Sequence, residues 1–449
     1  PEMKIPRKYF TLAVLAVLLY LLFLRLFFVS VPLLCVADQR SEFYDLRAAE
    51  LQKIAAGEIS LIVLRDWRGR IRRGGVAAGD VIVADDLEEL RRFLRDKPDA
   101  LALVPWYHAD VSWRTLRLDG LYFWENPREY PLRLAKWRWD KQPRFDARRI
   151  KNITIGGTVV LSRGIGNVID MTGEVNYPWR GIAPVFRAAD LSIVNLKSPL
   201  VYNYSKPKDR LQLYGQARYA EGLRQAGIDL VSVAGNHIGD AGAVGIRDTL
   251  DVLDKLQIQY TGVAQELAGA YEPRFAQLGD LRVAFLAVNS VGPNYYRDTD
   301  IRGAEIVYHV ASFLRERLAQ AIAKARAADI VIVMCNWGDE YTARPNKFQQ
   351  TWGEWLAAQD VTIVAGDQAH WVQKADFRRG TAIAYGLGNL IFDQTWSGDT
   401  REGVITRYFV YDKKLAAADI LPVFLNDQWY TEISADRAKI IKMLGRMFN

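Results

Sequence analysis

The chain has 449 residues, of which 50% are hydrophobic and 25% are charged. This length and composition provide for two or three domains with full hydrophobic cores, and they exclude an intrinsically disordered protein. Only two cysteines are present, which excludes a disulfide-stabilised scaffold, and the net charge is +7.

The segment Tyr9–Leu34 reads YFTLAVLAVLLYLLFLRLFFVSVPLL and contains a single charge, Arg25. A helix of this length crosses a hydrocarbon core of roughly 30 Å at about 1.5 Å per residue. It has no polar face, unlike a buried helix of a soluble domain. It is also longer than the core of a secretory signal peptide and lacks a small-x-small cleavage pattern. We therefore expect an uncleaved transmembrane helix over residues 9–34.

Three basic residues, Lys4, Arg7 and Lys8, precede this run. Positive charge stays on the cytoplasmic side of a membrane, so residues 1–8 are expected in the cytoplasm. The sequence thus predicts a single-pass membrane protein whose body is extracytoplasmic, either periplasmic or extracellular.

Residues 36–127 have the pattern of a small α/β module. Buried strands are expected at Ser60–Leu64 and Ala100–Pro105, and a helix with apolar residues at helical spacing is expected at Asp86–Arg95. The run ALALVPWYHADVSWRTLRLDG is similar to part of a lobe of periplasmic solute-binding proteins, but the similarity is too short to indicate a ligand.

Residues 128–152 form a linker. Its segment Arg128–Lys151 is basic and has interleaved aromatic residues. One interpretation is contact with anionic lipid headgroups or an acidic partner. The other is a solvated linker with a few docking aromatic side chains. Nucleic acid is not expected as a partner, because the body is placed outside the cytoplasm.

A second block, residues 153–425, alternates apolar strands with helices, which predicts an α/β domain with helices on both faces of a sheet. Residues 426–449 form a C-terminal extension with an amphipathic helix at Ser434–Phe448, expected to pack on the body. The strands are expected at Thr158–Leu161, Leu191–Asn195, Leu230–Ala234, Val283–Val288, Ile330–Cys335, Val361–Ala365 and Thr381–Tyr385, and the helices at Ala217–Ala226, Ala243–Leu256 and Ala311–Ala327.

Polar side chains gather where these strands end, and such ends carry the functional residues of α/β sheets. The segments are Asn195–Pro199, Ala234–His237, Asn336–Tyr341, Gly366–His370 and Tyr385–Asn389.

Three of these segments, with their flanks, read AGIDLVSVAGNH followed by DAGAVGIRDTLDVL, then NWGDEY, then AYGLGNLIFDQ. In this order and spacing the chain resembles the CapA family of poly-γ-glutamate capsule proteins from about Ile153 to Gln394. The resemblance implies a calcineurin-like metallophosphatase fold with a metal site at the strand ends.

The resemblance also implies that this metal site is degraded. Asn236, His237 and His370 match the family pattern, whereas Thr158, Lys197, Asn336 and Gln368 stand where the family has other residue types. The full candidate site is Thr158, Asn195, Lys197, Asn236, His237, Asn336, Glu340, Asp367, Gln368 and His370.

A two-metal hydrolytic site needs several anionic or imidazole ligands. The ammonium of Lys197 offers only donors and should repel a cation by several kcal/mol at a distance of about 4 Å. We expect Lys197 to form an ion pair with Asp367 in place of a metal, and therefore no cofactor. The alternative is one surviving Mn, Fe or Zn ion bound by His237, His370, Asp367 and Asn236.

The chain has no Gly-x-Ser-x-Gly, no phosphate-cradling Gly-x-x-x-x-Gly-Lys and no Cys-x-x-Cys motif. We expect a pseudoenzyme that serves as a structural or assembly subunit of a membrane complex, with residues 9–34 packed against other membrane subunits. The alternative is a metal-dependent enzyme or accessory factor in the synthesis of poly-γ-glutamate or a similar capsule polymer. A third possibility is a module that binds an anion near Lys197.

Overall fold

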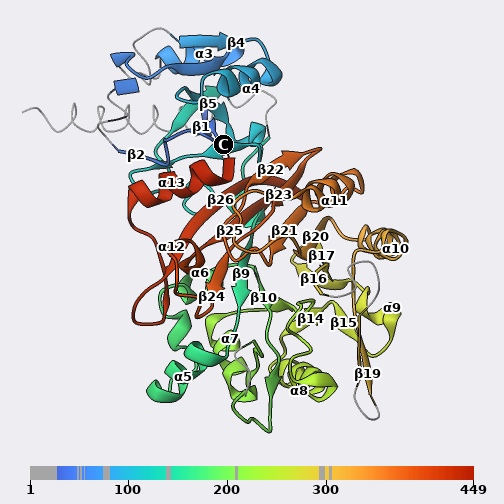
Figure 1. The fold of residues 1–449 in the computed structure, drawn as a ribbon. Coiled ribbons are helices and arrows are strands. Elements are labelled where there is room, and N and C mark those ends of the chain that lie inside the picture. Colours follow the sequence, from blue (N-terminus) through green and yellow to red (C-terminus); the bar gives the residue numbers. More distant parts are fainter. Residues whose placement is uncertain are drawn as a thin grey trace, which may run out of the picture. The chain divides into compact units, whose positions relative to one another are not determined.

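The computed structural model describes residues 28–47, 50, 53–54, 56–73, 81–137, 143–207, 211–292, 299–302 and 306–448. Two compact units can be distinguished (Figure 1). The first comprises the described residues up to Ala109 together with Thr115–Arg148, and the second comprises Asp110–Arg114 and the chain from Arg149 onward.

The first unit is built on a mixed sheet with the strand order β4-β3-β5-β1, in which β1 also pairs with β8. Strands β3 and β4 are parallel to each other, β3 is parallel to β5, and β1 is antiparallel to both β5 and β8. Asp86 caps helix α4 through a bond from Glu89 N to its side chain. The elements are β1 Phe28–Asp38, β2 Asp45–Leu46, β3 Leu61–Leu64, α3 Arg65–Arg73, β4 Val81–Ala84, α4 Leu87–Asp96, β5 Leu101–Pro105, β7 Arg117–Leu118 and β8 Arg133–Trp137, and the short strand β6 Trp113–Thr115 spans the sequence boundary between the two units.

Strand β1 occupies part of the segment that the sequence predicts as a transmembrane helix. Residues 28–34 are strand, and Val31, Leu33 and Leu34 are buried in the first unit. A continuous apolar run suits a strand buried on both faces as well as a helix, and its periodicity does not separate the two. The expectation is thus wrong for residues 28–34, and residues 9–27 lie outside the described residues. Along the described chain, no helix combines the length and the apolar character needed to cross a bilayer.

The basic stretch contributes a strand to this sheet. Strand β8 pairs along β1 from Phe28 opposite Trp137 to Pro32 opposite Arg133. This part of the expected linker therefore belongs to a folded unit, because its backbone is held by a ladder of hydrogen bonds. Residues 138–142 lie outside the described residues.

The second unit contains two large sheets. The first sheet has the order β14-β13-β10-β9-β25-β26-β27, with β24 also paired to β9, and the second has the order β16-β17-β20-β21-β23-β22. The sheets adjoin at β9 and β21. The strands of the first sheet are β9 Ile150–Val159, β10 Leu191–Leu196, β13 Leu230–Ser232, β14 Gln259–Thr261, β24 Asn389–Ile391, β25 Glu402–Tyr411, β26 Lys414–Leu425 and β27 Thr431–Ile433, and those of the second are β16 Arg274–Leu278, β17 Leu281–Asn289, β20 Ile330–Asn336, β21 Ile363–Asp367, β22 Ala375–Arg378 and β23 Thr381–Ala384.

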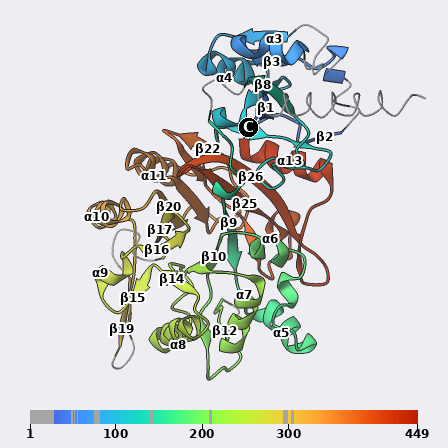
Figure 2. The same cartoon turned by 180° about the vertical axis from the view of Figure 1, so that it is seen from behind.

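Helices lie on the outer sides of both sheets (Figures 1 and 2). Apolar side chains of α10 and α11, such as Leu318 and Leu356, share one core cluster with Val333 of β20 and Val364 of β21. The helices are α5 Arg163–Thr172, α6 Ala183–Arg187, α7 Ala220–Ala226, α8 Gly242–Lys255, α9 Leu267–Ala270, α10 Arg315–Ala325, α11 Lys347–Ala358, α12 Gly398–Arg401 and α13 Arg437–Phe448, and the remaining short strands are β11 Leu200–Val201, β12 Gly215–Gln216, β15 Val263–Ala264, β18 Thr299–Arg302 and β19 Val307–Val310.

Every strand expected in the second block is present. The observed and expected boundaries differ by a few residues at most, except that β9 begins at Ile150 and not at Thr158. The arrangement differs from the expectation in one respect, since the strands divide into two sheets rather than forming one. The C-terminal helix is confirmed as α13, which packs on the body through Ile440, Met443, Leu444 and Met447.

Candidate functional site

The ends of the parallel strands bring most of the expected residues into one buried group, here called the strand-end cluster. Thr158 and Asn195 are neighbours across β9 and β10, and Asn336 and Asp367 are neighbours across β20 and β21. Because carboxyl ends of parallel strands meet at one edge, these side chains converge. The cluster comprises Thr158, Asn195, Lys197, Asn336, Asp367, Gln368 and His370, all of them buried.

The carboxylate of Asp367 connects the two sheets of the second unit. One of its oxygens accepts a hydrogen bond from Thr158 Oγ1, and the other accepts one from Asn195 Nδ2. Both donors are on the first sheet, whereas Asp367 ends β21 in the second. Asp367 therefore has both oxygens engaged by neutral donors.

The ammonium of Lys197 is completely buried, with 0% of the residue exposed. Its Nζ donates to Gln368 Oε1 at 2.5 Å and lies 3.5 Å from His370 Nε2. Burial lowers the pKa of Lys197 to about 8, and the negative charges of Asp367, Glu340 and Asp240 oppose this shift. The group still carries its proton at neutral pH.

The orientation of His370 follows from its contact with Asn389. The Nδ1 of His370 lies 2.8 Å from Asn389 Oδ1, and Asn389 Nδ2 donates to the backbone oxygen of Thr400 at 2.7 Å. Since the Asn389 oxygen faces the ring, Nδ1 of His370 carries the hydrogen and the lone pair of Nε2 faces Lys197. Burial, together with the Lys197 charge, lowers the pKa of His370 well below its ordinary value, so the ring is neutral.

A chain of amides lies beside this group. Asn336 Nδ2 donates to Asn289 Oδ1 at 2.7 Å and to Asn236 Oδ1 at 3.3 Å. Two buried amide oxygens, Asn195 Oδ1 and Asn336 Oδ1, have no hydrogen-bond partner among the described residues. Asn236 is thus joined to the cluster through Asn336.

His237 forms a separate pair with Asp240. Its Nδ1 lies 2.8 Å from Asp240 Oδ2, and 24% of the His237 side chain is exposed. The same Asp240 oxygen accepts a bond from Leu213 N at 2.6 Å. His237 is therefore oriented by a carboxylate of its own and not by the strand-end cluster.

Glu340 stands at the exposed side of the cluster. It accepts a hydrogen bond from Gln368 Nε2 at 3.0 Å and lies 3.9 Å from His370 Nε2. Next to it, the ring of Tyr341 stacks on His370, and the ring of Trp396, which is 62% exposed, contacts Tyr341 edge-on. The aromatic pair lies at the exposed side of the buried polar group.

Asn289 and Trp396 lie outside the strand-end segments that the sequence marks, whereas Tyr341 and Asn389 lie inside two of those segments but not in the expected site. Neutral amides and single aromatic residues follow no spacing rule, and the position of Asn289 at the end of β17 is the one signal that could have pointed to it. The expected ion pair between Lys197 and Asp367 is wrong: in the described structure Lys197 instead contacts Gln368 and His370, and Asp367 contacts Thr158 and Asn195.

The side chains present do not fit the metal site that the family resemblance implies. Among the described residues, no group of three or more His, Cys, Asp or Glu side chains is placed to hold a metal ion. The two free amide oxygens of Asn195 and Asn336 are neutral, and the ammonium of Lys197 lies in the same buried group. A dication needs anionic or imidazole ligands with free lone pairs, which this arrangement does not provide.

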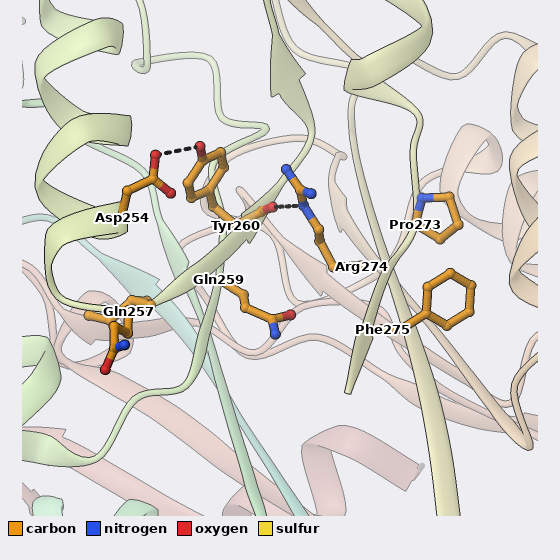
Figure 3. A pocket seen from close by; sticks show the side chains of 8 residues that line it. Asp254, Gln257, Gln259, Tyr260, Pro273, Arg274 and Phe275 are labelled. Carbon is orange, nitrogen blue, oxygen red and sulfur yellow. Dashed lines mark hydrogen bonds between the residues drawn. The ribbon is translucent and has the colours of Figure 1, made fainter. Parts of the chain in front are cut away.

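A separate pocket of about 440 Å³ lies between α8 and the strands β14 and β16 (Figure 3). In it, Tyr260 OH donates to Asp254 at 3.2 Å, and Arg274 Nε donates to the backbone oxygen of Tyr260 at 2.8 Å. None of its lining residues belongs to the strand-end cluster or to the expected site.

The chain is similar in sequence to two relatives and has a weak structural similarity to one solved structure. It is 24% identical to the capsule biosynthesis protein CapA of Bacillus anthracis, over 61% of this chain and 67% of that protein. It is also 24% identical to the PGA biosynthesis protein CapA of Bacillus subtilis, over 63% of this chain and 74% of that protein. The sulfate thiohydrolase SoxB of Thermus thermophilus matches at 13% identity over 57% of this chain and 41% of that one, with a TM-score of 0.32.

The family described as bacterial capsule synthesis protein PGA_cap matches residues 152–394, which is more than half of the chain. These limits agree closely with the region in which the sequence motifs resemble CapA proteins. The chain belongs to the bacterial capsule synthesis protein family PGA_cap.

Proposed function

We propose that this protein is a non-catalytic accessory protein in the synthesis of an anionic polymer of the poly-γ-glutamate type, and that it acts as an assembly subunit at the extracytoplasmic face of a membrane. The observation that carries the proposal is the fully buried ammonium of Lys197 in the strand-end cluster. A hydrolytic metal site at this place would need anionic or imidazole ligands where Lys197, Asn336 and Gln368 stand.

The second unit is proposed to derive from a metallophosphatase-type fold whose framework has been kept for another use. The contacts of Asp367 and His370 support this, because Thr158 and Asn195 donate to the two oxygens of Asp367 and Lys197 faces the lone pair of His370 Nε2. A buried network in which most donors and acceptors are paired stabilises one arrangement of the strand ends. The motifs that define the family therefore have a structural role here.

Attachment to a membrane through residues 9–27 is part of the proposal. This run keeps an apolar sequence with Arg25 as its one charge, and as a helix it would span roughly 28 Å at about 1.5 Å per residue. Other membrane subunits are the proposed partners of that segment. The basic stretch from Arg128 to Lys151 is the proposed contact for anionic lipid or an acidic partner.

A substitution of His237 distinguishes an accessory protein from an enzyme. It is partly exposed and paired with Asp240, so it is the side chain best placed to act on a substrate in an enzyme. We expect His237→Ala, introduced into a strain that depends on this protein for polymer, to leave the polymer yield within about twofold of wild type. Loss of polymer with an unchanged melting temperature would establish an enzyme instead.

The attachment has its own test. Full-length protein is expected in the membrane fraction and to resist extraction with high salt, whereas protein lacking residues 1–27 is expected in the soluble fraction. Recovery of the shortened protein in the membrane fraction would contradict the proposed anchor and would leave the result with His237→Ala unaffected.

A further inference from the structure

We propose that the buried ammonium of Lys197 takes the place of a metal ion and joins the two sheets of the second unit without one. Lys197 follows β10 of the first sheet, whereas its two contacts, Gln368 and His370, follow β21 of the second. The single charge thus connects loops that come from different sheets.

The groups around Lys197 are arranged as ligands are arranged around a cation. Gln368 Oε1 and His370 Nε2 both direct lone pairs at Nζ, at 2.5 Å and 3.5 Å. The histidine is fixed in this orientation by Asn389, which holds the hydrogen on Nδ1. An outer partner that fixes the tautomer of a histidine is the usual arrangement behind a metal-binding imidazole, and here it serves an ammonium.

The charged groups that favour the protonated amine of Lys197 are carboxylates. Asp367 and Glu340 supply the negative charges that favour the protonated amine, and Glu340 lies 3.9 Å from His370 Nε2. A metal ion at the same place would be repelled by Lys197 by several kcal/mol for each unit of charge at an effective dielectric constant near 20. The ammonium and a metal are therefore alternatives.

The backbone at the second-sheet side of this contact is held in an uncommon conformation. Gln368 and His370 have φ values of 93° and 59°, both in the left-handed region that side chains other than glycine rarely adopt. Such a conformation persists only where surrounding contacts hold it. The bonds from Lys197 to Gln368 and from His370 to Asn389 are contacts of that kind.

This inference deepens the proposed function, since an accessory protein without metal chemistry needs strand ends that are stable without metal. It can be tested apart from that function, because metal content and melting temperature do not depend on polymer synthesis.

The experiment compares wild type with Lys197→Glu, which replaces the ammonium by a carboxylate, and with Lys197→Met, which removes the charge at similar volume. Each protein is purified from metal-depleted medium, incubated with Mn²⁺ or Zn²⁺, passed through gel filtration and assayed by elemental analysis. Melting temperatures are measured with and without EDTA. A fourth protein, Lys197→Glu with His370→Gln, locates any metal that is gained.

Wild type and Lys197→Met are expected to hold less than 0.1 equivalent of metal and to melt at the same temperature with and without EDTA. Lys197→Glu is expected to gain about one equivalent and to melt at least about 5 °C higher with metal than with EDTA. The double variant is expected to lose most of that gain.

Two results would overturn the proposal. The first is about one equivalent of tightly bound metal in wild type that disappears in His370→Gln. The second is a folded Lys197→Glu that gains no metal. If Lys197→Glu does not fold even with metal, the melting temperature of wild type grown without transition metals is measured instead. An unchanged melting temperature supports the proposal. A melting temperature that is lowered, and that Mn²⁺ or Zn²⁺ restores, refutes it.

Discussion

The hydroxyl of Thr158, at the end of β9, donates a hydrogen bond to the carboxylate of Asp367, at the end of β21. The two residues are far apart in the sequence and belong to different sheets, so the bond fixes how the strand ends of the second unit meet. Asn195 adds a second bond to the same carboxylate. The stability of the unit should depend on this carboxylate.

We expect Asp367→Asn to lower the free energy of unfolding by about 2–4 kcal/mol, because an amide accepts at one position only and no longer offsets the charge of Lys197. Urea denaturation followed by circular dichroism measures the change. Asp254→Asn, which makes the same replacement at an exposed position, is the matched control and should change the value by less than about 0.5 kcal/mol. Equal effects of the two would contradict the role given to Asp367.

The pKa of Lys197 predicts a dependence of stability on pH. Its folded value is about 8, below the ordinary value of 10.5. Between these values the unfolded chain holds a proton that the folded chain has released, so stability rises with pH. Relative to Lys197→Met, the free energy of unfolding of wild type should rise from pH 8 to pH 10 by at most about 3 kcal/mol. Urea titrations of both proteins at intervals of half a pH unit measure this rise. A difference between wild type and Lys197→Met that stays constant with pH would show that Lys197 is not charged and buried.

A buried ion pair between Arg407 of β25 and Asp419 of β26 makes the hairpin sensitive to one substitution. Both side chains are less than a tenth exposed. Arg407→Met should lower the free energy of unfolding by about 3–5 kcal/mol, because Asp419 is left charged and buried. Arg378→Met, at a half-exposed arginine paired with Glu354, should cost less than about 1 kcal/mol. A small effect at Arg407 would mean that water reaches Asp419.

Gly366, in the middle of the second sheet, has no room for a side chain. A Cβ there would collide with the backbone oxygen of Tyr385 and with the indole nitrogen of Trp337. We expect Gly366→Ala to lower the melting temperature by several degrees, which corresponds to about 2 kcal/mol or more. Gly398→Ala is the control, since nothing lies within 4 Å of the added carbon. A thermal scan that finds the two equal would contradict this packing.

Continuous apolar strands made much of the second unit predictable. Leu191–Leu196, Leu230–Ser232 and Ile330–Asn336 are buried along their whole length, and a polar residue lies at or next to the end of each. The convergence of Asn195, Asn336 and Asp367 follows from the rule that carboxyl ends of parallel strands share an edge. The membership of the site could therefore be predicted largely from order and spacing.

The partners within the site could not be predicted. Lys197 reaches Gln368 and His370 rather than Asp367, and the choice depends on side-chain directions that a sequence does not contain. The hairpin of β25 and β26 was also missed. Its turn places Asp412 and Lys413 at φ values of 51° and 64°, where a glycine is the usual signal, and the pair Asp-Lys carries no such signal.

The apolar run that begins before β1 predicts a single helix, because nothing in its composition marks a boundary at Phe28. Both a membrane helix and a strand covered on both faces favour uninterrupted apolar residues. The pairing of Leu33 with Pro105 and of Phe28 with Trp137 is a long-range feature, and it decides where the strand begins.

Strand β1 has a mechanical consequence. Its first half pairs with β8 and its second half pairs with β5, so a force applied at Phe28 along the strand is resisted by two antiparallel ladders. Hydrogen bonds loaded in shear share the force and must yield together. Tension that reaches the first unit from the preceding residues is thus borne by the backbone of its central strand.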